Sequence, residues 1–378
     1  MLITFLSESS FRRFLTNQNK RSPRISYLMR VENTIKKLYG TIFEKPLLFS
    51  FPAIYRALLL LNIYTPRLKE TYLEITNVCN LRCKMCIYQR MQRHRGRMSR
   101  ELFRRCVDQL SDIGIDTLWL HFGGESLLHP DFKEFLEYAI HQRNLGKIGR
   151  VCWVDNGMLF NKKMADLVIS SKVDLISFSL DGVRQVNDKI RLGSDYSAIE
   201  KNIKYLLDKR GEEDKPEIRL SMCDYGKNEE EELEVYREWT PFVDGITLIP
   251  SIRFDNTIEN KEGLQRLETL DPPPFCIFPF DTLAIGWDGK VTGCCLDYVF
   301  RMVLGDAAKE SLKQVWQGAK FQQFRKEVLT NNFSAGSPCY KCEFWKVNFE
   351  PKDELILNGK ATIQYGYIYR KIRKKSQR

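Results

Sequence analysis

The sequence has no hydrophobic run long enough to cross a membrane. Its longest apolar stretch, AIYRALLLLNIY (residues 53–64), contains Arg56 and falls short of the roughly 20 apolar residues that a spanning helix needs. The opening residues, MLITFLSESS, have neither the basic leader nor the small-residue cleavage site of a secretory signal. We therefore expect neither a membrane-spanning nor an exported protein.

Histidine is scarce, with four residues, whereas cysteine is not, with 11. In a chain without an export signal, grouped cysteines bind metal or carry out redox chemistry more often than they form disulfides, because the cytoplasm keeps thiols reduced. We expect a cytoplasmic protein with metal-binding or redox cysteines.

An even spread of positive charge is also missing. The formal net charge is +11, from 59 Lys and Arg against 48 Asp and Glu. Residues 1–70 hold twelve of these bases against four acids, residues 361–378 hold six bases and no acid, and the body between them is nearly neutral. A nucleic-acid-binding protein usually spreads positive charge over a binding face, so we expect no nucleic-acid partner.

Residues 1–70 are predicted to be a basic, helical N-terminal extension. An amphipathic cap packed on the rest of the chain is the favoured interpretation. Phe49, Phe51 and Tyr55 lie close to basic residues, as in segments that rest on anionic membranes, so peripheral contact with the inner face of the membrane is the alternative. Residues 351–378 are predicted to be a basic C-terminal tail.

Between residues 71 and 250, strand-like runs alternate with longer helix-like runs. Such βα repeats predict an α/β fold with a parallel sheet, open or curled into a barrel, in which ligands bind beyond the carboxyl ends of the strands. The predicted strands are residues 71–76, 116–122, 150–155, 174–180, 217–223 and 244–250, with helices starting near Ser99, Asp131, Asn161, Asp195 and Asn228.

The distinctive residues of this region follow predicted strands. Each glycine-containing motif taken alone is compatible with an ordinary turn. Because the carboxyl ends of parallel strands share one edge of the sheet, we expect these motifs to meet. They are CNLRCKMC (residues 79–86), Gly123–Glu125, Asn156–Gly157 and Asp181–Gly182.

Cys79, Cys83 and Cys86 place three thiols within eight residues. A structural zinc site closes with four ligands, usually in two pairs, and His94 is the candidate fourth ligand for that alternative. An odd number of thiols without an export signal argues against a disulfide. A 4Fe-4S cluster takes four thiolates for full ligation, so three leave one iron open.

The C-x3-C-x2-C spacing after the first strand and the GGE motif after the second resemble the radical S-adenosylmethionine (SAM) enzymes over residues 71–250. The resemblance implies a (βα)6 partial, TIM-like barrel, and a SAM-binding 4Fe-4S cluster on Cys79, Cys83 and Cys86. It also implies cleavage of SAM to a 5′-deoxyadenosyl radical that takes a hydrogen atom from the substrate, with an external electron donor of the flavodoxin or ferredoxin type.

The same resemblance assigns further residues to SAM. Glycines permit close backbone approach and a carboxylate pairs with the methionine ammonium; a hydroxyl and a second carboxylate are expected on the ribose side, in the motif SFSLDG. An arginine in NDKIRLG is expected at the methionine carboxylate, with an ordinary surface arginine as the alternative. These residues are Gly123, Gly124, Glu125, Ser179, Asp181 and Arg191.

A second cysteine region follows the Pro-rich stretch LDPPPFC (residues 270–276). Its pattern resembles the SPASM, or Twitch, domain with one auxiliary 4Fe-4S cluster, predicted here over residues 251–350. A zinc site with the same four ligands is the other interpretation of the spacing. Cys295 is an alternative to Cys294, because neighbouring side chains of a strand point to different sides. The implied ligands are Cys276, Cys294, Cys339 and Cys342.

A fully ligated auxiliary cluster has no open iron for a substrate, so we expect it to accept or relay an electron. The predicted function is therefore a radical SAM oxidoreductase. Within the family, the cysteine spacing is most similar to that of the dehydrogenase acting on 2-deoxy-scyllo-inosamine, which implies a cyclitol, sugar or similar alcohol as the substrate. The alternatives are a peptide-modifying radical SAM enzyme and a zinc-stabilised nucleic-acid-binding or scaffold protein. No general base is assigned, and structural roles are expected for His121 and His129. Cys106 falls in a predicted helix and Cys152 and Cys223 fall in predicted strands, so all three are expected to be free, buried cysteines.

Overall fold

The computed structural model describes residues 56, 59, 65–224, 229–251, 276–334 and 336–344, and the backbone of residues 355–357 and 361–365. All of these residues belong to one compact unit that begins at Arg56. Most of the predicted N-terminal extension, the Pro-rich stretch and the end of the predicted tail lie outside the described residues.

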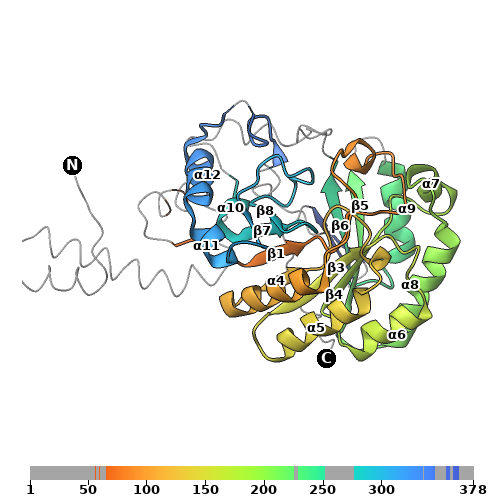
Figure 1. Cartoon of the computed structure of the whole chain (residues 1–378). Coiled ribbons are helices and arrows are strands. Elements are labelled where there is room, and N and C mark those ends of the chain that lie inside the picture. Colours follow the sequence, from red (N-terminus) through yellow and green to blue (C-terminus); the bar gives the residue numbers. More distant parts are fainter. Residues whose placement is uncertain are drawn as a thin grey trace, which may run out of the picture. The chain divides into compact units, whose positions relative to one another are not determined.

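A parallel sheet forms the centre of the structure, with strand order β6-β5-β4-β3-β2-β1 (Figure 1). Each neighbouring pair is parallel and in sequential order, which confirms the predicted α/β partial barrel. The strands are β1 (Glu70–Leu73), β2 (Thr117–Trp119), β3 (Arg150–Asp155), β4 (Leu175–Ser179), β5 (Glu217–Asp224) and β6 (Gly245–Pro250).

Helices connect these strands and lie along the outside of the sheet (Figure 1). Three start at the predicted caps, because Ser99, Asn161 and Asp195 accept N–H bonds three residues on. Asp131 also precedes a helix but makes no such bond. The helices are α4 (Arg100–Ile113), α5 (Phe132–Asn144), α6 (Lys162–Ser170), α7 (Gln185–Ile190), α8 (Tyr196–Arg210) and α9 (Glu229–Trp239).

The helices pack on the sheet through apolar stripes. On α4, Phe103, Cys106, Val107 and Leu110 recur at helical spacing and are all buried. Phe103 stacks on Phe135 of α5, with 3.9 Å between the ring centroids. The burial of Cys106 agrees with its prediction as a structural cysteine.

The second cysteine region continues the same sheet. Strand β7 (Thr282–Ile285) pairs parallel with β1, so that Leu283 lies opposite Thr71. Antiparallel strands β8 (Lys290–Thr292) and β9 (Gly305–Asp306) follow. The helices of this region are α10 (Phe278–Asp281), α11 (Leu312–Gln317) and α12 (Ala319–Thr330).

Part of the predicted C-terminal tail is strand. β11 (Ala361–Tyr365) pairs parallel with β6, and β10 (Leu355–Leu357) pairs antiparallel with β11. These two strands extend the sheet beyond β6, at the edge opposite to β9.

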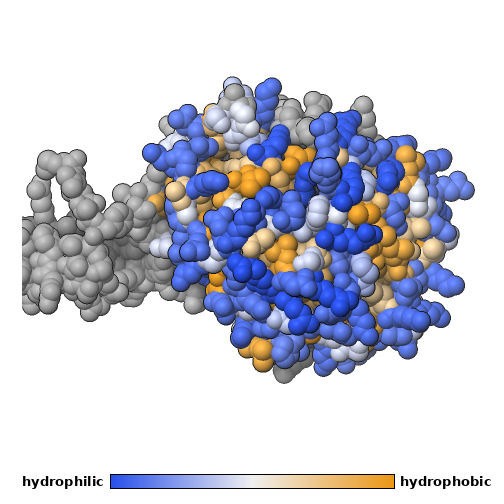
Figure 2. Space-filling model, in the orientation of Figure 1, coloured by the Kyte–Doolittle hydropathy of each residue, from blue (hydrophilic) through white to orange (hydrophobic). Residues whose placement is uncertain are grey.

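None of the described helices is long and apolar enough to cross a membrane. On the face drawn in Figure 2, hydrophilic residues predominate, and hydrophobic ones are visible between them.

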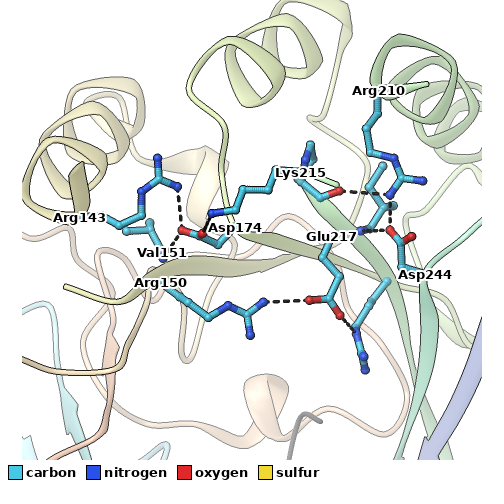
Figure 3. Close-up of polar contacts among 11 residues, drawn as sticks. Arg143, Arg150, Val151, Asp174, Arg210, Lys215, Glu217 and Asp244 are labelled. Carbon is cyan, nitrogen blue, oxygen red and sulfur yellow. Dashed lines mark hydrogen bonds and ion pairs between the residues drawn. The ribbon is translucent and has the colours of Figure 1, made fainter. Parts of the chain in front are cut away.

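A network of ion pairs joins the amino ends of the strands (Figure 3). Asp174, which directly precedes β4, accepts hydrogen bonds from Arg143 (2.8 Å) and from the Val151 N–H (3.0 Å), and also pairs with Lys215. Glu217 bonds Arg150 at 2.9 Å. Burial opposes ionisation of Asp174, but the hydrogen bonds from Lys215 and Arg143 lower its pKa below the ordinary value. This end of the sheet is therefore structural.

We expect Asp174→Asn to destabilise the protein by about 3 kcal/mol at pH 7, because it leaves a buried Arg143 without its counter-charge. A carboxylate with a lowered pKa stabilises the fold above its unfolded pKa, about 3.9, and loses that effect as the pH falls through its folded pKa. The difference in unfolding midpoint between wild type and variant should thus shrink below about pH 4. Glu137→Gln, in the exposed pair with Lys133, is the control and should change stability by less than about 0.5 kcal/mol.

Candidate functional site

A cavity of about 280 Å³ lies at the carboxyl ends of the strands. Its wall includes residues from the ends of β3, β4 and β5 and from the loop that follows β1. The motifs that follow the strands therefore lie at one site, as the sequence predicted. Of the predicted SAM and cluster residues, those that line the cavity are Cys79, Cys83, Cys86, Gly123, Gly124, Glu125, Ser179 and Arg191.

The three sulfurs of the first cysteine group each receive a hydrogen bond from a nitrogen. The Leu81 N–H donates to Cys79 Sγ at 3.5 Å, the Tyr88 N–H to Cys86 Sγ at 3.4 Å, and Arg191 Nη1 lies 3.9 Å from Cys83 Sγ. Cys86 is also the N-cap of the short helix η2 (Ile87–Arg90). Burial raises the pKa of the Cys79 thiol to about 11. Such a thiol becomes a thiolate only where a cation compensates its charge, as bound iron does.

The GGE motif packs directly on the cysteine loop. A Cβ on Gly124 would lie 2.6 Å from the Thr76 carbonyl oxygen and 2.7 Å from that of Val78. The Glu125 N–H donates to the Val78 carbonyl at 2.8 Å. Only glycine therefore fits between these two loops.

The Glu125 carboxylate is buried at the cavity wall. It accepts N–H bonds from Leu127 (3.1 Å) and Asn156 (2.9 Å), which fixes its orientation. Burial, with the nearby Asp155 as the second cause, raises the pKa of Glu125. A bound cation would favour its ionised form, in agreement with the predicted role at the methionine ammonium.

Arg191 and Asp181 form a buried pair beside the cavity. Arg191 Nε donates to Asp181 at 2.7 Å, and the second oxygen of Asp181 accepts the Cys223 N–H at 2.7 Å. Arg191 is 11% exposed, so the alternative of an ordinary surface arginine is wrong. Asp181 has both oxygens bonded and is not among the described residues that line the cavity, so its geometry favours holding Arg191 over contacting ribose. Ser179 does face the cavity, with its Oγ 3.3 Å from that of Ser221.

Cys294 and Cys295 of the second cysteine group are both buried. Burial raises the pKa of Cys294, and the next causes are the thiols of Cys295, Cys339, Cys276 and Cys342. Burial also raises the pKa of Cys295, and the next causes are the carboxylates of Glu70 and Asp281. Cys294 Sγ also accepts the Leu296 N–H at 3.4 Å. For Cys276, the thiols that raise the pKa after burial are those of Cys339, Cys342 and Cys295, so Cys294 and Cys295 both stay candidates for the fourth ligand.

A buried ion pair connects the first cysteine loop to the second cysteine region. Arg93 forms two hydrogen bonds with Glu74, at 2.7 and 3.0 Å, and donates to the Tyr298 carbonyl at 3.0 Å. Its guanidinium carbon lies 4.2 Å from the centroid of the Phe300 ring. A Cβ on Gly96, in the same loop, would lie 2.4 Å from the Trp287 ring. The loop and the second region are therefore packed together as one body.

Sequence comparison identifies both regions. Residues 73–238 match the family model of the radical SAM superfamily, and residues 276–343 match an iron-sulfur cluster-binding domain, SPASM. The chain belongs to the radical SAM superfamily. Its radical SAM domain uses a 4Fe-4S cluster and SAM, and its SPASM domain uses auxiliary iron-sulfur chemistry. The interpretation as a zinc-stabilised protein is wrong.

Curated relatives of this radical SAM chain differ in what they modify. The "tungsten-containing aldehyde ferredoxin oxidoreductase cofactor-modifying protein" of Pyrococcus furiosus is 26% identical over 320 residues, which cover 73% of this chain and 87% of the relative. The subtilosin biosynthesis protein AlbA of Bacillus subtilis is 33% identical over 120 residues, which cover 31% of this chain but only 25% of AlbA.

Among solved structures, Streptococcus suis SuiB bound to SAM superposes with a TM-score of 0.58, over 89% of this chain and 80% of SuiB, at 15% identity. The enzyme anSMEcpe with bound SAM superposes with a TM-score of 0.53, over 75% of this chain and 85% of that chain, also at 15% identity. At this identity the likeness supports the fold alone.

Several residues of the site carried no recognisable sequence signal. Glu74 and Arg93 are 19 residues apart, and Arg93 reads as one of many bases in an arginine-rich turn. Cys223 was predicted to be a buried structural cysteine, but it lines the cavity, near Cys86 and Cys83. Three consecutive residues of β5, Ser221, Met222 and Cys223, line the cavity, so the alternation of the strand did not single out Cys223.

We expect Gly124→Ala to abolish the spectral change that SAM causes in the reconstituted radical SAM cluster, because the added methyl group separates the GGE motif from the cysteine loop. Gly336→Ala is the matched control, since its Cβ would meet nothing within 4 Å, and it should behave like wild type. Undiminished SAM binding by Gly124→Ala, measured by ultraviolet-visible and electron paramagnetic resonance spectroscopy, would contradict the packing described for this turn.

Proposed function

We propose that this protein is a radical SAM oxidoreductase in which the auxiliary cluster takes an electron from the substrate. One observation carries the proposal: the same cavity is lined by the three cysteines and by residues of the SPASM region. Leu296 and Phe344, which both line the cavity, each follow a predicted auxiliary ligand by two residues, Cys294 and Cys342. The segments that carry Cys294 and Cys342 therefore also contribute side chains to the cavity wall.

Cys79, Cys83 and Cys86 are the proposed ligands of the SAM-binding cluster, and their three sulfurs with nitrogen donors fit that group. Bound SAM supplies a 5′-deoxyadenosyl radical, which removes a hydrogen atom from the substrate. The protein's part is to bind and orient. Gly124 and Glu125 form the edge for the methionine ammonium, Arg191 holds the carboxylate, and Ser179 contacts ribose.

In this proposal Asp181 acts through Arg191. Its two oxygens fix the Arg191 guanidinium and the Cys223 N–H, so it is a positioning residue. The Arg191 side chain then lies between Asp181 and Cys83 with little freedom to rotate, and a preorganised cation costs less ordering when the SAM carboxylate binds.

The proposed ligands of the auxiliary cluster are Cys276, Cys294, Cys339 and Cys342. Full ligation by four thiolates leaves no open iron, which suits electron transfer better than substrate binding. Loss of a hydrogen atom, a proton and an electron from the substrate then amounts to net oxidation. An external donor of the flavodoxin or ferredoxin type is proposed to reduce the SAM-binding cluster.

Modification of a peptide is the second candidate function. It is supported by the local similarity to AlbA, which is named for bacteriocin biosynthesis. The P. furiosus relative is named for modifying a cofactor, so similarity to it supports a non-peptide substrate equally well. A short precursor peptide encoded beside this protein would favour the peptide.

The proposed functional regions are 71–250 for the radical SAM barrel and 251–350 for the SPASM-type region, with the N-terminal extension and the C-terminal tail outside them. Contact of the basic N-terminal extension with a membrane stays a prediction, since nearly all of that extension lies outside the described residues.

Anaerobic reconstitution should give about eight irons per chain, four in each cluster. Replacing Cys79, Cys83 and Cys86 together by alanine should leave about four irons and abolish the formation of 5′-deoxyadenosine under reducing conditions. Replacing Cys339 and Cys342 by alanine should remove the other four and leave SAM cleavage intact. Formation of 5′-deoxyadenosine by the triple variant would sink the proposal.

The two adjacent cysteines provide a finer test of the auxiliary site. Cys294→Ala should lose the auxiliary cluster, whereas Cys295→Ala should keep about eight irons. Mössbauer spectroscopy and iron analysis distinguish the two variants. Loss of the cluster in Cys295→Ala alone would reverse the assignment of the ligand.

A further inference from the structure

The cavity has two unlike halves. The residues proposed to hold SAM come from the ends of β2 and β4 and from Arg191, and Asn156, just after β3, bonds Glu125 beside them. The other half, which we term the aromatic half, comes from β1, the end of β2 and the SPASM domain. It consists of Tyr72, His121, Phe122, Leu296, Tyr298 and Phe344.

Among the residues that the structure describes, the aromatic half presents no charged side chain to the cavity. Apart from the cysteines, the ionisable lining residues that carry charge are Glu125, Asp155 and Arg191, all in the SAM half. Rings join the barrel to the SPASM domain, because Phe122 lies 4.8 Å from Tyr298 and 5.9 Å from Phe300 between ring centroids. A ligand that enters this half therefore loses contact with water and gains contact with largely apolar side chains.

Besides the hydroxyl groups of Tyr72 and Tyr298, the polar side-chain atoms of this half are the ring nitrogens of His121. Its ring packs edge-on against Tyr72 (5.7 Å) and Trp119 (5.4 Å), so aromatic contacts fix its orientation. Its Nδ1 is buried and has no hydrogen-bond partner. His129 differs, because both of its ring nitrogens are bonded, to the Met98 carbonyl (2.9 Å) and the Asp131 N–H (3.0 Å). The predicted structural role thus fits His129 and does not explain His121.

The surroundings of His121 decide which of its nitrogens carries the proton. Burial lowers the pKa of His121 to about 3, so the imidazole is neutral and has a single N–H. A buried N–H without an acceptor is rarer and costlier than an unpaired lone pair. Because Nδ1 is buried without a partner, the tautomer with the proton on Nε2 is favoured. The Nε2–H can then donate a hydrogen bond to a molecule in the cavity.

We propose that His121 is a substrate-binding residue that donates a hydrogen bond to an oxygen atom of a largely apolar substrate. The substrate class that this half of the cavity fits is an aromatic or aliphatic group next to a carbonyl or hydroxyl oxygen. A cyclitol or free sugar does not fit, because most of its hydroxyl groups would lose water without gaining a partner. This inference rests on the proposed function, since it assigns SAM to the other lining residues of the cavity.

The test uses a pair of probes that differ in one acceptor oxygen, acetophenone and ethylbenzene. Their dissociation constants are measured by ligand-observed NMR on the anaerobically reconstituted protein with SAM bound. His121→Phe keeps the ring packing and removes the donor. We expect this variant to reduce the preference for acetophenone over ethylbenzene about tenfold, because the carbonyl is left without a partner. His121→Gln, which retains an N–H donor, should keep most of the preference.

His141→Gln, on the exposed surface of α5, is the control and should leave the preference unchanged. An unchanged preference in His121→Phe would overturn the assignment of His121. Displacement of acetophenone by millimolar myo-inositol would overturn the substrate class. If the phenylalanine variant does not assemble its clusters, the test uses His121→Gln, which retains a donor. Loss of the preference for acetophenone over ethylbenzene in that variant would also contradict the proposal. The spectral response to SAM in each sample is read separately, so failure of SAM binding identifies a failure of the proposed function instead.

Discussion

The contact between Glu74 and Arg93 joins the loop of the first three cysteines to the barrel and to the SPASM domain. Glu74 directly follows β1 and its side chain is wholly inaccessible to solvent, while Arg93 comes from the loop after the first three cysteines. A second donor to the same carboxylate is the Trp287 N–H of the SPASM domain, at 3.3 Å. A buried carboxylate is stable only with such partners. One ion pair thus sets the position of the radical SAM loop relative to the barrel and to the SPASM domain.

This arrangement explains why the SPASM domain continues the barrel sheet. β7 pairs with β1 along its length, and the Glu74 N–H donates to the Ile285 carbonyl at 2.9 Å immediately beyond that ladder. The strand therefore delivers Trp287 to Glu74 and to Gly96. The backbone hydrogen bonds between β1 and β7 and the ion pair between Glu74 and Arg93 both fix the distance between the barrel and the SPASM domain. The position of each therefore limits where the other can form.

Local signals made the fold and the centre of the site predictable. The alternating strands between residues 71 and 250 fixed the order of the elements, and strand ends in a parallel sheet necessarily share an edge. The spacing of Cys79, Cys83 and Cys86 predicted the cluster, which the family match supports. Asp181 was placed correctly just after its strand, but no sequence pattern revealed that Arg191 and the Cys223 N–H take both of its oxygens. Arg93 and His121 depend on partners brought together only by the folded chain, so their environments could not be predicted.

The turns that carry Cys294 and Cys342 also carry Leu296 and Phe344 into the cavity wall. With Cys294 and Cys342 as the proposed ligands of the auxiliary cluster, two tasks would share the same few residues of backbone: selecting the molecule that enters and setting the reduction potential of the auxiliary centre. A lineage that reshapes these turns for a new substrate also disturbs the electron acceptor, so substrate preference and redox tuning are constrained to evolve together.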